Sequence, residues 1–296
     1  GLELIREKLE GGMSFEDSLE STREEVVFTT HTPIKEGNEH HYYDALMYTG
    51  ANNGLTIEQL EKIGGVPFNM TVAALRLSRI SNAVADLHCQ TANEMWKNVD
   101  RRSEIIGITN AIHLPTWVDD EMIKAAEEDG DLWGTHMKNK QDLIEFVKER
   151  NGVKLSADAL LVGFSRRAAP YKRSNLIFTD REIIEPLLKE KKLQIVFSGK
   201  AHPLDDNGKK IVQDIVEISR EYPDAVVFLE NYDMTIGRML TRGSDIWLNN
   251  PRRPKEASGT SGMKAAMNGV LNVSILDGWW PEACIDGVNG WQFGDG

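Results

Sequence analysis

The stretch EASGTSGMKAAMNGV, residues 256–270, surrounds one lysine with small and hydroxyl-bearing residues. Glycines let a ligand approach the backbone closely, and the hydroxyl and backbone N–H groups of such a turn suit a phosphate or sugar hydroxyls. Lys264 stands just inside the turn, among apolar or small neighbours. Burial lowers the pKa of a lysine and enables its amine to form an imine with a carbonyl compound. The commonest role of a lysine is a surface ion pair, so these residues alone leave both interpretations open.

A second group of reactive residues lies in GFSRRAAPYKRSN, which carries Arg166, Arg167, Lys172 and Arg173 directly after a predicted strand. Cations combined with the free N–H groups of an opening helix form an anion site. In that interpretation Arg167 and Lys172 hold a phosphate from two sides. The alternative is a basic helix start whose charges are only solvated.

Histidine and cysteine add little to this chemistry. His31, in TTHTP, is placed at the end of the predicted strand VVFTTH, where a lone histidine is more often structural than catalytic. No second cluster at ligand spacing follows His40 and His41, so we predict no metal site. Cys89, in ADLHCQ, fits a buried helical cysteine better than a thiol nucleophile.

Composition limits the class of protein. The chain has 296 residues, a formal net charge of -12 and 2 cysteines. An acidic chain repels phosphate backbones, so nucleic acid is not an expected partner. Two cysteines are too few for a disulfide framework, which favours a reducing, cytoplasmic setting. No apolar run reaches membrane-spanning length, so no membrane partner is expected either.

The second half of the chain must position the two groups of reactive residues. From about Leu155, short apolar runs alternate with amphipathic ones, which predicts a doubly wound parallel α/β domain. The five predicted strands are residues 159–164, 193–199, 225–232, 245–250 and 270–276. Ligands of such sheets bind beyond the carboxyl ends of the strands. Both groups of reactive residues follow such ends, so the site is predicted there.

The first half has a different pattern. Helices are predicted over residues 15–25, 41–48, 57–63, 72–98 and 119–149. Only VVFTTH and EIIGIT are typical of strands, and two separated strands do not make a stable sheet. We therefore expect residues 1–153 to form a mostly helical, incomplete N-terminal lobe, and residues 154–296 to form the C-terminal lobe.

Several segments together carry a family resemblance. They lie in the family's order and span nearly the whole chain: VVFTTHTP, SNAVADLHCQ, IIGITNAIHLPTW, GFSRRAAPYKRSNLIF, IVFSGKAHP, VVFLENYDM, DIWLNNPRRPKEASGTSGMKAAMNGVLNVSILDGWW and NGWQFG. The chain resembles the α-glucan (glycogen or maltodextrin) phosphorylases, especially the shorter bacterial and archaeal type. EASGTSGMK combined with RRAAPYKR is highly specific for that family. The resemblance implies a glycosyltransferase of two Rossmann-like lobes, the GT-B type, with its site in the cleft.

The resemblance also implies a cofactor. The family binds pyridoxal 5′-phosphate on a lysine of this motif, which falls on Lys264. The link only tethers the cofactor, whose phosphate takes part in proton transfer with the substrate phosphate. Thr260, Ser261 and Arg166 would hold the cofactor phosphate, and Tyr232 would lie near the cofactor ring.

The implied reaction is phosphorolysis of a terminal α-1,4-glucosyl unit to glucose 1-phosphate, with retention. The partners are α-1,4-glucan and inorganic phosphate, and Arg167 and Lys172 would bind that phosphate. The carbonyl of His31 would stabilise an oxocarbenium-like centre. The residues expected to take glucosyl hydroxyls are Glu256, Ser258, Gly259, Tyr171, His31 and Asn110.

The sequence departs from the family in places. We find no glycine-rich phosphate loop before TTHTP, and Asp233 follows Tyr232 where mammalian-type members carry a basic residue. The chain therefore looks like a fragment, which we expect to be inactive in isolation and in which exposed apolar surface would favour self-association, leaving a homo-oligomer open. Two alternatives stay open: a GT-B glucosyltransferase that uses a sugar nucleotide, which needs no imine lysine, and a non-catalytic glucan-binding fragment.

Overall fold

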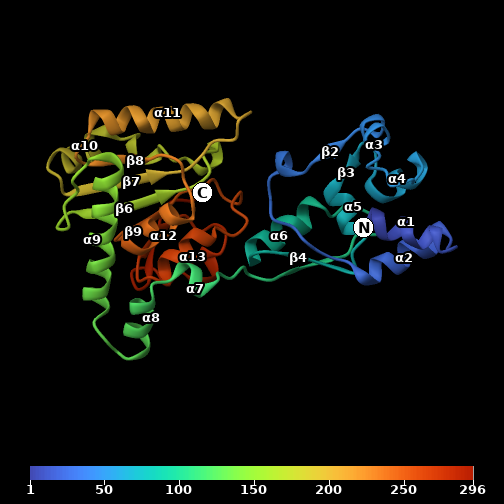
Figure 1. Ribbon diagram of the computed structural model, residues 1–296, viewed down its shortest axis with the longest axis horizontal. Coiled ribbons are helices and arrows are strands. Elements are labelled where there is room, and N and C mark those ends of the chain that lie inside the picture. The colour runs from blue at the N-terminus through green and yellow to red at the C-terminus, as the bar shows by residue number, and fades with distance from the viewer. Residues whose placement is uncertain (296) are drawn as a thin grey trace. The chain divides into compact units, whose positions relative to one another are not determined.

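The computed structural model describes residues 1–295 and is a mixed α/β protein with parallel sheets (Figure 1). The chain divides into two compact units. Unit 1 contains Gly1–Asn110 and Pro254–Ser258. Unit 2 contains Ala111–Arg253 and the described residues from Gly259 onward.

This division differs from the boundary expected after residue 153. Residues 111–153 pack with the second half of the chain, because the long helix α9, Leu132–Asn151, places Leu143, Ile144 and Val147 in the core beneath the unit 2 sheet. The helix predicted over residues 119–149 is in fact two helices, α8 (Asp120–Glu127) and α9, separated by a turn in which Asp129 has a positive φ of 55°.

Unit 2 is built on a six-stranded sheet in which every pair of neighbouring strands is parallel. The order across the sheet is β11-β10-β9-β6-β7-β8. The five predicted strands are confirmed, and β11 is an addition. The strands are β6 (Leu160–Ser165), β7 (Leu193–Ser198), β8 (Val226–Leu229), β9 (Ile246–Asn249), β10 (Leu271–Ser274) and β11 (Gly290–Gln292).

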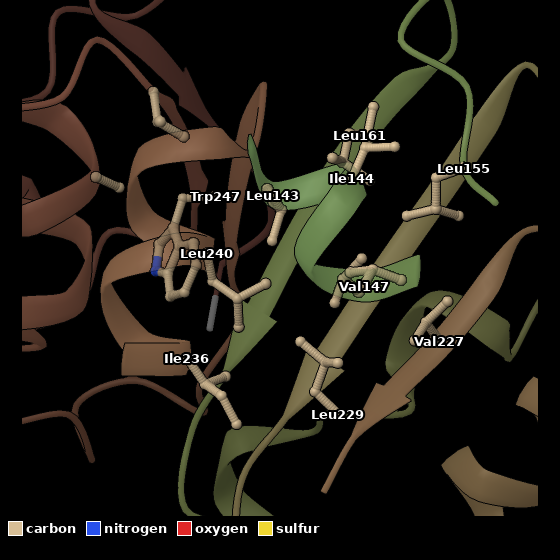
Figure 2. Close-up of a cluster of buried hydrophobic side chains, with 13 residues drawn as sticks. Leu143, Ile144, Val147, Leu155, Leu161, Val227, Leu229, Ile236, Leu240 and Trp247 are labelled. Atoms are coloured by element: carbon tan, nitrogen blue, oxygen red, sulfur yellow. The ribbon is translucent and has the colours of Figure 1, made fainter. Parts of the chain in front are cut away.

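Successive strand residues point to opposite faces, and both faces of this sheet are covered. On one face, α9, α12 and α13 enclose a cluster that includes Leu161 and Trp247; Figure 2 shows it. On the other, α10 and α11 pack over Phe164 and Phe197. The remaining helical elements of unit 2 are α7 (Leu114–Trp117), η2 (Pro170–Lys172), η3 (Leu176–Phe178), α10 (Arg181–Lys189), α11 (Asp206–Glu221), α12 (Met234–Gly243), α13 (Thr260–Ala266) and α14 (Trp280–Ala283).

Unit 1 contains a three-stranded parallel sheet in the order β1-β4-β5. The expectation of only two strands in this half was wrong, because the helix predicted over residues 72–98 is broken by the central strand β4. Its residues Ser81 and Ala83 are buried, while Ile80 and Asn82 are half-buried, an alternation too short to stand out between two helical stretches.

The other elements of unit 1 are mostly short helices around a separate core that includes Ile5, Leu60 and Phe68. The elements are α1 (Leu2–Glu10), α2 (Phe15–Glu25), β1 (Val27–Thr29), η1 (Lys35–Gly37), β2 (His40–His41), α3 (Tyr43–Thr49), α4 (Ile57–Gly64), β3 (Phe68–Asn69), α5 (Met70–Arg76), β4 (Ile80–Ala83), α6 (Asp86–Met95) and β5 (Glu104–Gly107).

Candidate functional site

The strand order of unit 2 creates a crevice at one place. In chain order the sheet is 3-2-1-4-5-6, the arrangement of dinucleotide-binding folds. The chain leaves β6 towards β7 on one side and leaves β9 towards β10 on the other, so the loops after β6 and β9 diverge. Ligands of such sheets bind at this switch point, beyond the carboxyl ends of the strands. The cationic segment, Arg166–Arg173, follows β6, and the segment that leads to Lys264 follows β9.

The cationic segment is held against the ends of β7 and β9. The Arg166 amide donates to the Ser198 carbonyl at 3.2 Å, and the Arg166 guanidinium donates through Nη1 to Asn249 Oδ1. Gly199, with a φ of 153°, has no room for a Cβ, which would lie well inside contact distance of the Arg166 carbonyl oxygen. Close packing against Gly199 therefore fixes the position of the Arg166 backbone, from which the guanidinium extends.

The expected helix N-terminus is absent from the cationic segment. The chain forms the 3-10 turns η2 and η3 there, and the α-helix begins only at Arg181. Pro170 disfavours helical geometry at the residue before it, and Arg173 ends η2 in the left-handed region with φ 50°. The predicted anion site would therefore have to be made of side-chain cations, without the N–H groups of an opening α-helix.

These cations differ in exposure. Lys172 is buried, with its Nζ 5.1 Å from the centre of the Tyr171 ring, whereas the Arg167 side chain is exposed. Burial, and then the charge of Arg252, lower the pKa of Arg173. Clustered positive charges repel one another and favour a bound anion.

Lys264 lies on α13, immediately after the glycine-hydroxyl turn. The helix begins after Gly259, whose φ of 82° is in the left-handed region that glycine tolerates. Lys264 is half-buried and burial lowers the pKa of its amine. Its Nζ lies 3.3 Å from the centre of the Trp117 ring, and no carboxylate within residues 1–295 pairs with it. The amine is thus held against an aromatic face rather than in a salt bridge.

Trp117 was not among the site residues predicted from the sequence. The segment NAIHLPTW was part of the resemblance, but nothing in its spacing pairs Trp117 with Lys264, which lies far along the chain. The contact depends on Asn268, which is fully buried one turn after the lysine. Asn268 Nδ2 donates to the carbonyls of Trp117 (3.1 Å) and Lys264 (2.7 Å), and its Oδ1 accepts from the Asp119 amide at 2.9 Å.

The hydroxyl residues beside Lys264 also have defined places. Thr260 is the first residue of α13, and the Ser261 hydroxyl accepts from Trp247 Nε1 at 3.2 Å. A Cβ on Gly262 would lie 2.6 Å from Asn272 Oδ1, so only glycine lets the helix pack this closely on β10. Tyr232, after β8, packs against the buried cluster that includes Leu161 and Trp247. Burial, and then the charge of Asp233, raise the pKa of Tyr232.

The predicted site residues fall in both units. The residues in unit 2 all follow carboxyl ends of strands of its sheet: Arg166, Arg167, Tyr171, Lys172, Tyr232, Gly259, Thr260, Ser261 and Lys264. The other four belong to unit 1: His31, Asn110, Glu256 and Ser258. His31 is exposed after β1, and the Asn110 amide donates to the Val84 carbonyl at 3.1 Å. Glu256 and Ser258 are buried.

Over residues 1–295, no group of three or more histidine, cysteine or acidic side chains is arranged to hold a metal ion. No helix in that range is both long and apolar enough to cross a membrane.

Comparison with known proteins decides the family. Residues 108–283 match the model of the carbohydrate phosphorylases. The chain belongs to the carbohydrate phosphorylase family. It is 36% identical to a glycogen phosphorylase of Aquifex aeolicus over 97% of the chain and 49% of that protein. It is 37% identical to a maltodextrin phosphorylase of Thermococcus litoralis over 97% of the chain and 40% of that protein. A glycogen phosphorylase of Mycobacterium tuberculosis is 33% identical over 99% of the chain and 41% of its own length.

The chain thus spans less than half the length of these phosphorylases. The family match covers the strand-end segments of unit 2, including Arg166 and Lys264. In this chain, Asp233 caps α12 by accepting from the Ile236 amide at 2.8 Å. The acidic residue after Tyr232 is therefore explained by the start of the helix.

Proposed function

We propose that this chain carries the cofactor and phosphate site of an α-glucan phosphorylase. The reaction is phosphorolysis of a terminal α-1,4-glucosyl unit of a glucan, with retention, to give glucose 1-phosphate. The C1–O4 bond breaks, an oxygen of inorganic phosphate bonds to C1 on the same face, and the leaving O4 takes a proton. The observation that carries the proposal is the half-buried Lys264 amine, held on Trp117 in the segment after β9, beside the strand β6 after which the cationic segment begins.

The residues present fit pyridoxal 5′-phosphate. Lys264 offers an amine whose pKa is lowered by burial, which increases the share of the neutral, nucleophilic form. Trp117 offers a flat aromatic surface beside that amine. Arg166 offers a cation beside the carboxyl end of β9. When bound, the cofactor supplies a phosphate group that exchanges a proton with the substrate phosphate.

The chain's own residues bind and neutralise charge. Arg166, with the hydroxyls of Thr260 and Ser261, would hold the cofactor phosphate, and Tyr232 would contribute to the surroundings of its ring. Arg167 and Lys172 hold inorganic phosphate. Two adjacent phosphates repel, so these cations must neutralise them before one can share a proton with the other. Preorganised cations are effective because they need no reorientation during the reaction.

Glucan recognition is assigned to the remaining predicted residues. In unit 2, Tyr171 and Gly259 are the candidates for binding glucosyl hydroxyls. In unit 1, the candidates are Glu256, Ser258 and Asn110, and the carbonyl of His31 is the candidate for stabilising the positive charge that develops at C1. Relatives named as glycogen and maltodextrin phosphorylases support an α-glucan as the substrate. The two cysteines are both free, in keeping with the proposed cytoplasmic setting.

The cofactor assignment is tested by covalent trapping. The protein is incubated with pyridoxal 5′-phosphate, reduced with borohydride and mapped by peptide mass spectrometry. We expect the pyridoxyl label on Lys264 and its loss in Lys264→Ala, while Lys200→Ala serves as the matched control and keeps the label. A label on Lys172 or Lys200 in place of Lys264 would contradict the assignment.

The phosphate assignment has its own test. Arg167→Ala and Lys172→Ala each remove a charge-assisted contact, which is worth on the order of 1.5–3 kcal/mol. Because the isolated chain is expected to be inactive, both variants are made in a full-length enzyme that contains this chain. There we expect them to weaken the use of phosphate in glucose 1-phosphate formation from maltodextrin, and to affect glucan binding far less. Unchanged phosphate dependence in both, or turnover with a sugar nucleotide but not with phosphate, would refute the proposed reaction.

A further inference from the structure

Asn249, the last residue of β9, has its side-chain amide fixed on both sides. Its Oδ1 accepts from Arg166 Nη1, and its Nδ2 donates to Ser274 Oγ at 3.2 Å. The Ser274 hydroxyl in turn donates to the Ile275 carbonyl at 2.8 Å. An arginine offers only donors, so the amide oxygen must face Arg166. Asn249 is 4% exposed, and water therefore does not compete for this contact.

The chemical type of this partner matters. A carboxylate in the same place would also hold the guanidinium, but it would add a negative charge beside the site where an anion must bind. The amide oxygen gives direction to Arg166 and adds no net charge. Asparagine and aspartate have nearly the same shape, so aspartate at this position would differ by its negative charge and by the loss of the Nδ2 donor to Ser274 Oγ.

The residues after Asn249 hold the other end of the cationic segment in the same neutral way. The Asn250 and Pro251 carbonyls accept from Arg173 Nε (2.8 Å) and Nη2 (2.7 Å). Asn250 Nδ2 donates back to the Arg173 carbonyl at 3.2 Å. The Arg252 amide donates to the Tyr171 carbonyl at 2.7 Å. Arg173 has a left-handed backbone, which surrounding contacts of this kind must maintain.

We propose that Asn249 is a positioning residue that aims Arg166 at the phosphate of the bound cofactor through an acceptor that adds no negative charge. The segment Asn249–Arg252 thereby holds the cationic segment Arg166–Arg173 through amide and backbone contacts that add no negative charge. This inference rests on the proposed function, because it assumes that the anion beside Arg166 is the cofactor phosphate.

The test compares two probes that differ only in the phosphate. Pyridoxal 5′-phosphate and pyridoxal are titrated into the protein, with binding followed by absorbance. For Asn249→Asp we expect about a ten- to hundredfold loss of affinity for pyridoxal 5′-phosphate, the range for a contact to a charged group, while affinity for pyridoxal changes by less than about twofold. Asn249→Ala adds no negative charge but removes the acceptor that orients Arg166. Its loss of affinity for pyridoxal 5′-phosphate should therefore be smaller than that of Asn249→Asp.

The matched control is Gln194→Glu, which also buries a carboxylate in place of an amide in this sheet. Gln194 lies near the amino end of β7, is 1% exposed and hydrogen-bonds to Ser156 and Asp224. Gln194→Glu should change the free energy of unfolding without changing the ratio of the affinities for pyridoxal 5′-phosphate and pyridoxal. An equal fall for both probes in Asn249→Asp, or an unchanged ratio, would show a purely structural role and overturn the inference.

A second measurement keeps the test valid if Asn249→Asp does not fold. In a double-mutant cycle, Asn249→Ala should lower the affinity ratio in the wild-type background and have no further effect in Arg166→Met. An equal effect in both backgrounds would overturn the inference. Failure of the wild-type protein to bind pyridoxal 5′-phosphate more tightly than pyridoxal would instead count against the proposed function.

Discussion

Replacing Asp245 by asparagine removes the only negative charge from a buried hydrogen-bonded group that joins α9 to the sheet of unit 2. One oxygen of Asp245 accepts from His136 Nε2 at 2.9 Å. The other accepts from Lys140 Nζ at 2.8 Å and from the Leu161 amide at 2.7 Å. Asparagine keeps one acceptor oxygen for these three donors and leaves the ammonium of Lys140, whose residue is 4% exposed, without its counter-charge.

Breaking a buried ion pair by removing one partner costs about 3–5 kcal/mol, because the other charge stays buried and unpaired. We expect Asp245→Asn to lower the free energy of unfolding of unit 2 by that amount. The measurement is urea unfolding followed by tryptophan fluorescence, since Trp247 is buried in the same core. The control is Glu121→Gln, which breaks an exposed 2.6 Å pair with Lys138 and should cost at most about 1 kcal/mol.

The pH dependence gives an independent check on this reasoning. Burial alone would raise the pKa of Asp245, but hydrogen bonds from His136, Lys140 and Leu161 together hold that pKa below its ordinary value. A lowered carboxyl pKa stabilises the fold above the unfolded-state pKa, and the stabilisation is lost as pH falls through the folded-state pKa. The difference between wild type and Asp245→Asn should therefore shrink in acid below about pH 4. A loss no larger than that of Glu121→Gln at neutral pH would refute the argument.

Three further changes test other parts of the structure. Gly199→Ala should cost about 1–3 kcal/mol in denaturant unfolding and weaken phosphate binding, because the new methyl group displaces the Arg166 carbonyl; full retention of both would contradict the close packing. Asn268→Ala should destabilise unit 2 by about 1–3 kcal/mol through the buried groups it leaves unpaired, and should slow pyridoxyl labelling of Lys264 as measured by mass spectrometry. Burial lowers the pKa of His88 to about 4, so unit 1 should lose about 1–3 kcal/mol between pH 6.5 and pH 4, where the unfolded chain binds a proton that the folded chain does not. His88→Gln should remove that pH-dependent loss, which is measured as the free energy of unfolding at each pH. An unchanged dependence on pH in the variant would contradict the role assigned to His88.

Part of the fold could be predicted because the signal was local. Strands covered on both faces are continuous apolar runs, and those of β6 and β7 were plain between their amphipathic neighbours. The strand β4 was missed because its four residues alternate between buried and half-buried positions among helical stretches. The short edge strand β11 has only three residues, of which only Gly290 is buried, and this is too little for a pattern.

For the candidate site, too, the sequence determined one part and the tertiary structure the other. By itself the sequence determined which residue types are available: the lysine in its glycine-hydroxyl turn, the cationic segment after β6, and the family to which both belong. Only the tertiary structure decided their partners. Arg166 meets Asn249, Lys264 meets Trp117, and these contacts join segments far apart in the chain. The reason is physical: the strand order places β9 beside β6, which brings Asn249 to Arg166. The buried Asn268 bonds to the carbonyls of both Trp117 and Lys264, which holds Trp117 beside that lysine. Neither pair follows from spacing along the sequence.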